Sequence, residues 1–425
     1  MKPTQLARLI SLIGALAYLP SASAANVATL DLPALLNLVI DNNPSMQAQA
    51  QTLKAAGYSV DTAAWQYVLT PSFSVQQAST ANNDPSYQGD KQVSVFALQQ
   101  PLWTGGKLDA GMEKAHQEQQ QAQSSFNEIR QDLRLKTIQA FADWSTARLR
   151  FQAFDNSVNA HTSLYERIQR RVQEGLSTES DLTLARSRLD QVKADQWLAK
   201  MQEDSALSNL SQLSGEKITS QRLAMSSAMP ISTQADDAVN QMLAVNPSIR
   251  RSEASAAVAL SEVEIQKSAH WPDVYLRLEQ QHGNFMIRGA DSDVRVILGM
   301  QSKFGAGLST LSAIEGAKAK HQASVLDIES SKRIASQQIL SEWINAHHLT
   351  TRLDALKTAL MSAQQIQASW DRQFVLGKKS WLDVMNAARE VSQLELQLAE
   401  ATGSLLNSSW KLAVFTQAQG TQLAF

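Results

Sequence analysis

The side chains that could do chemistry in this chain are its carboxylates and histidines, because the 425-residue sequence contains no cysteine. That absence excludes disulfides, thiolate metal sites and a cysteine nucleophile. His347 and His348 are adjacent, so they do not share a helix face, and a solvated surface explains them better than a metal site. Asp109 and Glu113 stand four apart, and a solvated helix face again explains them better than an acid–base pair. No nucleophile elbow, phosphate loop or metal-ligand spacing occurs, so we expect no enzyme, cofactor or metal.

One other pattern of useful residue types occurs twice. A glycine is followed six residues later by an aspartate, first as Gly175 and Asp181 and then as Gly377 and Asp383. Glycine can take the left-handed conformation that ends a helix, and the Ser, Thr and Asp residues after it can cap the next helix. Each stretch therefore predicts a reversal between two helices. An ordinary loop at the end of a bundle would explain either stretch alone, and the recurrence favours a shared function.

The two stretches belong to two copies of one longer unit. Four landmarks recur in the same order, each about 200 residues later. They are Asn43-Pro44 with Asn246-Pro247, Pro71 with Pro272, Trp103-Thr-Gly-Gly106 with Phe304-Gly-Ala-Gly307, and Gly175 with Gly377. Such self-similarity indicates a tandem repeat. We divide the chain into a first repeat at 25–213, a joint at 214–235, a second repeat at 236–416 and a C-terminal tail at 417–425.

Long tracts without proline predict long helices in both repeats. All ten prolines lie at or before residue 272, and none lies between residues 102 and 229. Because proline breaks helix interiors, each repeat can hold one helix from its glycine landmark to its reversal. A helix of ~67 residues is about 100 Å long, which requires a coiled coil or an extended bundle. Apolar residues that step by four and three agree with coiled-coil packing, as in Leu349, Leu353, Leu356 and Leu360.

Between the proline and glycine landmarks, alternating apolar residues predict two strands per repeat. The predicted strands lie at about 71–79, 91–99, 272–280 and 293–301. Their apolar faces are Phe73 with Val75, Val93 with Val95 and Ala97, Val274 with Leu276 and Leu278, and Val294 with Val296 and Leu298. Such strands fit a transmembrane barrel, although a soluble sheet with one wet face would look alike. Four strands cannot close a barrel, for which about eight is the smallest common number, whereas three chains together supply twelve.

Residues 1–24 are typical of a secretory signal peptide. Lys2 and Arg8 give a positive segment before a short apolar run. Ala22-Ser23-Ala24 fits the small-residue cleavage rule, so we expect cleavage after Ala24. The run is too short for a membrane helix, which needs about 20 apolar residues. The formal net charge of −2 gives no sign of nucleic-acid binding.

The Asn-Pro landmarks, the Pro-Leu-Trp-Thr-Gly-Gly segment at 101–106 and the two reversals together resemble the TolC family, the outer-membrane efflux proteins of Gram-negative bacteria. The resemblance covers nearly all of the chain after the signal. It implies a mainly α fold with a small β part, in which long coiled-coil helices form an α-barrel. It also implies a homotrimer whose twelve-stranded barrel lies in outer-membrane lipid above a periplasmic tunnel. The joint would contribute to an equatorial belt around that tunnel.

The same resemblance implies a passive export channel with protein partners. Gly175 and Gly377 would mark the periplasmic tip, where such channels meet a periplasmic adaptor and an ATP- or proton-driven inner-membrane pump. The run at 377–386 is similar to members that serve type I secretion of proteins or adhesins, so this cargo is our first hypothesis. Multidrug or small-molecule efflux is the alternative cargo. A non-conducting periplasmic scaffold of coiled coils is the alternative of another class.

The resemblance further implies roles for five residues of the reversals. Relatives carry two inward aspartates at the pore constriction, and the matching positions here hold Asp383 and Asn386. One ring of aspartates should attract cations less strongly than two. A closed-state latch in relatives joins an aspartate to an arginine and a tyrosine, and those positions hold Asp181, Lys379 and Phe374. Lysine lacks the bidentate fork and phenylalanine lacks the hydroxyl, so we expect a weaker latch. The alternative role of Asp383 is a helix cap.

Overall fold

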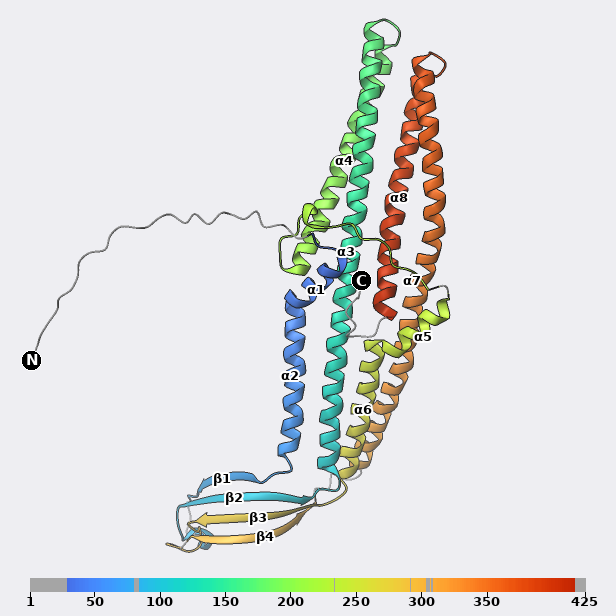
Figure 1. Cartoon of the computed structure of the whole chain (residues 1–425). Helices are drawn as coiled ribbons and strands as arrows, with labels where there is room; N and C mark the ends of the chain where they lie inside the picture. Colours follow the sequence, from blue (N-terminus) through green and yellow to red (C-terminus); the bar gives the residue numbers. More distant parts are fainter. Residues whose placement is uncertain are drawn as a thin grey trace, which may run out of the picture.

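The computed structural model describes residues 29–79, 84–232, 234–290, 292–302, 306 and 309–416. The predicted signal peptide, the predicted tail at 417–425, and Phe304 and Gly307 of the second glycine landmark lie outside the described residues. The described part is long and narrow. Helices run along its length, a sheet lies at one end, and two helical hairpins lie side by side at the other (Figure 1).

The two repeats contain the same helices in the same order. The first repeat has α1 (Leu32–Asn42), α2 (Pro44–Trp65), α3 (Lys107–Gln173) and α4 (Glu179–Ser214). The second has α5 (Ala235–Val245), α6 (Pro247–Ser268), α7 (Ser309–Val375) and α8 (Trp381–Thr416). Corresponding helices have 11, 22, 67 and 36 residues in both repeats. The repeat in the sequence is therefore also a repeat of structure.

The Asn-Pro landmarks are helix starts. Asn43 and Asn246 have extended backbones, and each side chain accepts a hydrogen bond from the serine N–H two residues later, at 3.0 and 2.9 Å. Pro44 and Pro247 follow as the first helical residues, where the backbone needs no N–H donor. Each landmark thus ends one short helix and starts the next.

In the described residues, four strands form one antiparallel sheet in chain order. They are β1 (Thr70–Gln77), β2 (Gln92–Trp103), β3 (Asp273–His282) and β4 (Asp293–Gln301). The central pair joins the two repeats, because β2 belongs to the first and β3 to the second, with Leu98 opposite Leu278. Within one chain, β1 and β4 are the edge strands.

Register gives the sheet one apolar and one polar face, because directly opposite residues in an antiparallel pair point to the same side. Phe73 lies opposite Phe96, for example, and Val95 lies opposite Ser74 and Gln281. The apolar face carries Phe73, Val75, Phe96, Leu98, Leu276, Leu278, Val294, Val296, Leu298 and Met300. The polar face carries Ser72, Ser74, Gln76, Gln99, Arg277, Glu279, Gln281 and Arg295.

The predicted apolar face of β2 is wrong. Val93, Val95 and Ala97 point to the polar side of the sheet, and Phe96 and Leu98 point to the apolar side. β2 has apolar residues at consecutive positions, so alternation within this strand does not fix which set faces which way. Pairing with β1 and β3 fixes it, because a shift of one residue would turn every side chain to the other face.

The largest core lies midway along the helices. Leu32 and Leu35 of α1 pack there against Phe141 and Trp144 of α3, together with Leu406 of α8. Phe141 and Trp144 are essentially fully buried, with ring centroids 5.2 Å apart. This core fixes the long helices to one another at the level where the joint crosses them (Figure 1). Among the described helices, none combines the length and the apolarity that spanning a membrane requires.

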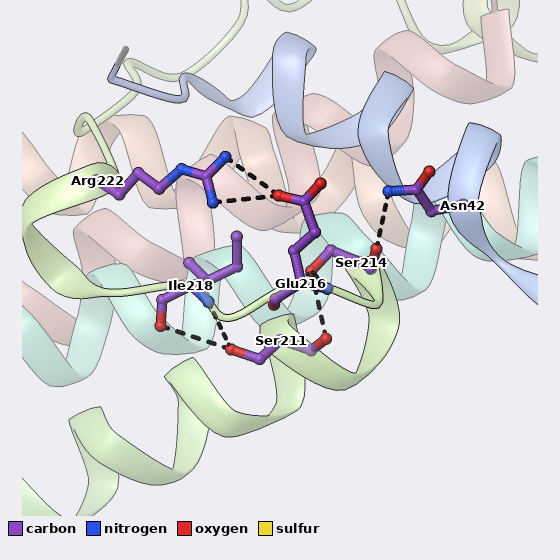
Figure 2. A network of polar contacts seen from close by, with 6 residues as sticks. All are labelled: Asn42, Ser211, Ser214, Glu216, Ile218 and Arg222. Carbon is purple, nitrogen blue, oxygen red and sulfur yellow. Dashed lines mark hydrogen bonds and ion pairs between the residues drawn. The ribbon is translucent and has the colours of Figure 1, made fainter. Parts of the chain in front are cut away.

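Polar contacts hold the first turn of the joint (Figure 2). Gly215 ends α4 in the left-handed conformation, with φ of 72°. The contacts join the Asn42 amide to the Ser214 carbonyl, the Ser211 hydroxyl to the Ile218 main chain, and Arg222 to Glu216. They replace the helical hydrogen bonds that the chain loses where it leaves α4.

Residues 216–232, which we call the belt segment, continue from this turn through the short 3₁₀ helix η2 (Ser220–Arg222) and then cross α8 and α7. The Trp410 indole donates to the Ser227 carbonyl at 2.9 Å, and the Met229 N–H donates to the Ser409 hydroxyl at 3.1 Å. The Trp343 indole of α7 donates to the Ser232 carbonyl at 2.9 Å. The side of α7 and α8 that carries Trp343, Ser409 and Trp410 therefore faces the belt segment.

Candidate functional site at the helix reversals

The two predicted reversals end their first helices in the same way. Gly175 and Gly377 both have φ of 72°, a conformation open to glycine because it has no Cβ. In the first reversal, Leu176 N–H donates to the Arg171 carbonyl at 2.7 Å, and Gly175 N–H donates to Val172 at 3.0 Å. The second has the equivalent bonds at 2.9 and 3.0 Å. This is the Schellman pattern, which satisfies the last carbonyls of a helix.

A capping box starts the next helix in each reversal. Thr178 and Asp181 exchange N–H to side-chain hydrogen bonds of 3.0 and 3.2 Å. Ser380 and Asp383 do the same at 3.0 and 3.2 Å, and the Ser380 hydroxyl also donates to the carboxylate at 2.9 Å. Each pair satisfies two N–H groups that lack a partner inside the helix. Asp383 therefore takes part in capping α8 as its third residue, whereas Ser380 holds the N-cap position that the sequence analysis offered as the alternative role of Asp383.

These hydrogen bonds stabilise the charged form of both aspartates. The Ser380 hydroxyl, followed by the Ser380 N–H, lowers the pKa of Asp383 below its ordinary value. The Thr178 N–H, then the Thr178 hydroxyl and more weakly the Trp381 indole, lower the pKa of Asp181. Both reversals thus carry a negative charge that persists to acidic pH.

Asp383 is partly exposed and Asn386 is exposed in the second hairpin. They are three residues apart and so share one side of α8. Val384 and Met385 are buried on the side that faces the rest of the chain, whereas Asn386 is exposed. The structure thus leaves Asn386 and part of the Asp383 carboxylate available to solvent, and their place in a pore stays a prediction.

Contacts that the sequence did not predict join the two reversals of one chain. Trp381, the first residue of α8, donates its indole N–H to the Asp181 carboxylate at 3.1 Å. Further along the hairpins, Arg167 of α3 pairs with Asp371 of α7 at 2.6 Å. A tryptophan just after a turn was a usable signal, because a buried indole N–H needs an acceptor. Nothing in the local sequence identifies that acceptor, which lies 200 residues away.

The three residues of the predicted latch have different partners in the structure. Asp181 contacts Trp381, whereas the Lys379 ammonium lies over the Trp370 ring, 4.3 Å from its centroid. Phe374 is buried in the core between the hairpins. No ion pair joins Asp181 to Lys379 within the described chain, so a latch through Lys379 stays a prediction.

The other residues singled out in the sequence have ordinary partners. Asp109 accepts the Tyr67 hydroxyl at 2.8 Å, and Glu113 accepts the Gln117 amide at 2.7 Å. His347 stacks on the Trp343 ring with centroids 5.1 Å apart. In the part of the chain that the structure describes, no three His, Asp or Glu side chains gather into a metal site.

At the opposite end of the molecule, the apolar face of the sheet is exposed. Val296, Leu298 and Met300 of β4 are 69%, 71% and 73% exposed, and Phe73 of β1 is 70% exposed. A continuous apolar face of this kind marks contact with another chain or with a membrane. Because β1 and β4 also carry unpaired backbone groups along their outer edges, the sheet end needs further strands as well as an apolar covering.

Comparison with known proteins gives consistent results. The sequence profile described as outer membrane efflux protein matches residues 35–216 and 238–416. Outer membrane protein TolC of Vibrio cholerae serotype O1 is 22% identical over 389 residues, which cover 87% of each chain. Two of the similar solved structures are outer membrane protein VceC from Vibrio cholerae and the CmeC outer membrane channel of Campylobacter jejuni. VceC gives a TM-score of 0.79 at 15% identity, covering 91% of this chain and 96% of that one. CmeC gives a TM-score of 0.77 at 16% identity, covering 92% of this chain and 87% of the CmeC chain.

Proposed function

Because the chain belongs to the outer membrane efflux protein family, we propose that three copies of it form one export channel for proteins or adhesins in type I secretion. The protein is an outer-membrane channel of the TolC type with a long periplasmic tunnel, and it is a transport conduit rather than an enzyme. The trimer, its partners and its cargo are the proposed parts, and they are argued separately below.

The open sheet is the observation that carries the assembly. β1 and β4 are unpaired edges in one chain, and the same four strands expose one apolar face. Pairing β1 of one chain with β4 of the next satisfies both edges, and three chains close a ring of about twelve strands, within the range of membrane barrels. The apolar face then meets lipid. The polar face, with Arg277, Glu279 and Arg295, lines the interior.

The two reversals support a partner at the far end of the helices. Leu176 and Leu376, each next to the turning glycine, are 60% and 69% exposed, and Val375 is 68% exposed. Exposed apolar residues at the tip of a long hairpin suit a protein contact. We assign this contact to a periplasmic adaptor, which in turn connects the channel to an inner-membrane pump. The pump supplies the energy, since no catalytic constellation occurs among the described residues.

The cargo proposal is supported by the run at 377–386, which is similar to members that serve type I secretion. A strain that lacks this chain should lose large secreted proteins from its culture supernatant, and its drug susceptibility should stay near that of the parent. The opposite pattern, a gain in drug susceptibility with an unchanged supernatant, would favour small-molecule efflux.

Single-channel recording in planar bilayers tests the channel itself, and it can also separate the two roles of Asp383. Asp383→Ala removes the carboxylate and the capping box, whereas Ser380→Ala breaks the box and keeps the charge. We expect small cation-selective currents from wild type, with selectivity reduced in Asp383→Ala but retained in Ser380→Ala. Equal effects of both variants would assign Asp383 to capping alone. A folded trimer without conductance would exclude a conducting channel and favour the non-conducting scaffold.

A further inference from the structure

A polar cavity lies between the long helices, far from the reversals. Its volume is about 420 Å³, and its lining includes Asp143 and Thr146 of α3, Glu342 of α7, and Asn407 and Ser408 of α8. Gly403 of α8 also lines it, and a Cβ at this position would overlap the Thr146 hydroxyl. The close approach of α3 and α8 beneath the cavity therefore depends on this glycine.

The cavity opens on the side of the helices away from the belt segment. Ser409 and Trp410 of α8 bond to the belt segment, whereas Ser404 lines the cavity. Ser404 is five and six positions earlier, and at about 100° per residue it lies on the opposite side of α8. In the proposed trimer the belt segment lies outside, so the cavity faces the tunnel. To this extent the inference rests on the proposed function.

Three side chains that line the cavity use a hydrogen-bond donor within the protein. The Gln139 amide donates to Asp143 at 2.9 Å, and the Thr146 hydroxyl donates to the Ala142 carbonyl at 2.8 Å. The Ser408 hydroxyl donates to Glu342 at 2.6 Å. The Asn407 side-chain oxygen is buried and has no hydrogen-bond partner among the described residues. The Asp143 carboxylate and the Asn407 oxygen therefore keep lone pairs that a ligand can use.

The charges of the cavity leave one carboxylate uncompensated. Lys411 lies 3.6 Å from Glu342 and also donates to Gln139 at 3.0 Å, so it balances the Glu342 charge. Asp143 forms no ion pair within the described residues, and Gln139 occupies only one of its two oxygens. A ligand with one positive charge would balance Asp143.

From this lining we propose that the cavity binds small organic ammonium ions, such as protonated primary amines. An ammonium group carries one positive charge and three N–H donors, which complement the uncompensated Asp143 carboxylate and the unpaired Asn407 oxygen. It can donate to Asp143 and to the otherwise unpaired Asn407 oxygen. The volume is within the usual range for small-molecule sites. A divalent metal suits the site less well, because no third His, Asp or Glu side chain joins Asp143 and Glu342 in the described structure.

Isothermal titration of the detergent-solubilised, full-length protein with phenethylamine at neutral pH tests the proposal. The neutral analogue 2-phenylethanol, which has a similar shape, should bind much more weakly. Asp143→Asn keeps the shape of the side chain and removes its charge, and we expect the affinity for the amine to fall on the order of tenfold. Asn407→Leu removes the unpaired oxygen and should also weaken binding. Asp132→Asn is the matched control, because Asp132 is an exposed carboxylate of α3 outside the cavity and should have no effect.

Three results would overturn the proposal: no binding of the amine to wild type, equal binding of the alcohol, or equal weakening by the control. The migration of folded trimer on a gel shows whether each variant has assembled, and Asp143→Asn is an exposed, isosteric change that should do so. Conductance is recorded on the same preparations. If the protein conducts but binds no amine, the binding site is excluded and the channel proposal stands. If the protein binds the amine but does not conduct, the channel proposal is excluded and the binding site stands.

Discussion

One indole connects the two reversals of the chain. Trp381 is only 8% exposed and packs in the core with Phe374, yet its N–H reaches the Asp181 carboxylate at 3.1 Å. The resemblance to relatives would place a hydroxyl at residue 374, where this chain has phenylalanine. We propose that the Trp381 indole takes the place of that hydroxyl as a donor to Asp181.

Trp381→Phe should loosen this connection while keeping most of the packing. It removes one hydrogen bond to a carboxylate, whose net contribution is about 1 kcal/mol, and we expect a higher mean single-channel conductance. Trp197→Phe is the matched control, because Trp197 is 73% exposed on α4. Unchanged currents in Trp381→Phe would show that this bond does not hold the reversals closed.

Because Asp181 and Asp383 take part in helix capping as carboxylates, we expect the reversals to become less stable in acid. The pKa of Asp181 and of Asp383 is lower in the folded chain than its ordinary value, so their hydrogen bonds stabilise the folded reversals above about pH 4. That stabilisation is lost as the pH falls through the lower, folded-state values. Hydrogen exchange at the starts of α4 and α8, corrected for intrinsic rates, should therefore accelerate below about pH 4.

Ser380→Ala is the control for the acid response, because it removes the hydroxyl, which is the largest cause of the lowered Asp383 pKa, and keeps the backbone N–H. In this variant the acid response should shrink at the start of α8 and persist at the start of α4. An identical response in both helices would assign it to some other titrating group.

At the scale of elements, local rules set where each helix begins and ends. The positions of Gly175, Gly377, Asp181 and Asp383 follow from capping chemistry that acts over six residues, which is why the sequence located both reversals. The bond from Trp381 to Asp181 and the phase of β2 depend on segments that approach only in the folded chain. Sequence patterns within one element cannot supply that information.

Two glycine substitutions should have opposite effects on stability. A Cβ at Gly377 or at Gly111 would meet no atom within 4 Å, so only the backbone differs between them. Gly377 has φ of 72°, and Gly377→Ala should destabilise the chain by about 1 kcal/mol. Gly111 lies within α3, and Gly111→Ala should stabilise it by about 0.5–1 kcal/mol. Thermal unfolding measures both, and shifts of the same sign would contradict the argument.

At the scale of the whole molecule, the sheet must be placed where one face meets lipid and the other meets water. Neighbouring residues of β4 belong to opposite faces: Val296 is on the apolar side with Leu278, and Ile297 is on the polar side opposite Arg277. The alternation of the strands fitted a membrane barrel and a soluble sheet alike, and the resemblance to the TolC family implied the barrel. Family membership and the exposed apolar face together favour the barrel.

Lysine substitutions at these two neighbours should separate the faces. Val296→Lys places a charge on the proposed lipid side, at a cost of about 2–4 kcal/mol near the bilayer centre, and should deplete the trimer from outer-membrane fractions. Ile297→Lys changes the same strand on the proposed interior side and should leave assembly nearly intact. Equal loss of trimer from the outer-membrane fractions in both variants would mean that the apolar face does not contact lipid.

The equal lengths of α3 and α7, 67 residues each, restrict how this chain can evolve. One residue inserted in α3 alone would carry the first reversal about 1.5 Å further and rotate it by about 100° relative to the second. The indole of Trp381 would then miss the Asp181 carboxylate. The two helices must therefore keep equal lengths for the reversals to stay in contact. A lineage can lengthen or shorten its tunnel only through insertions or deletions that occur in both repeats.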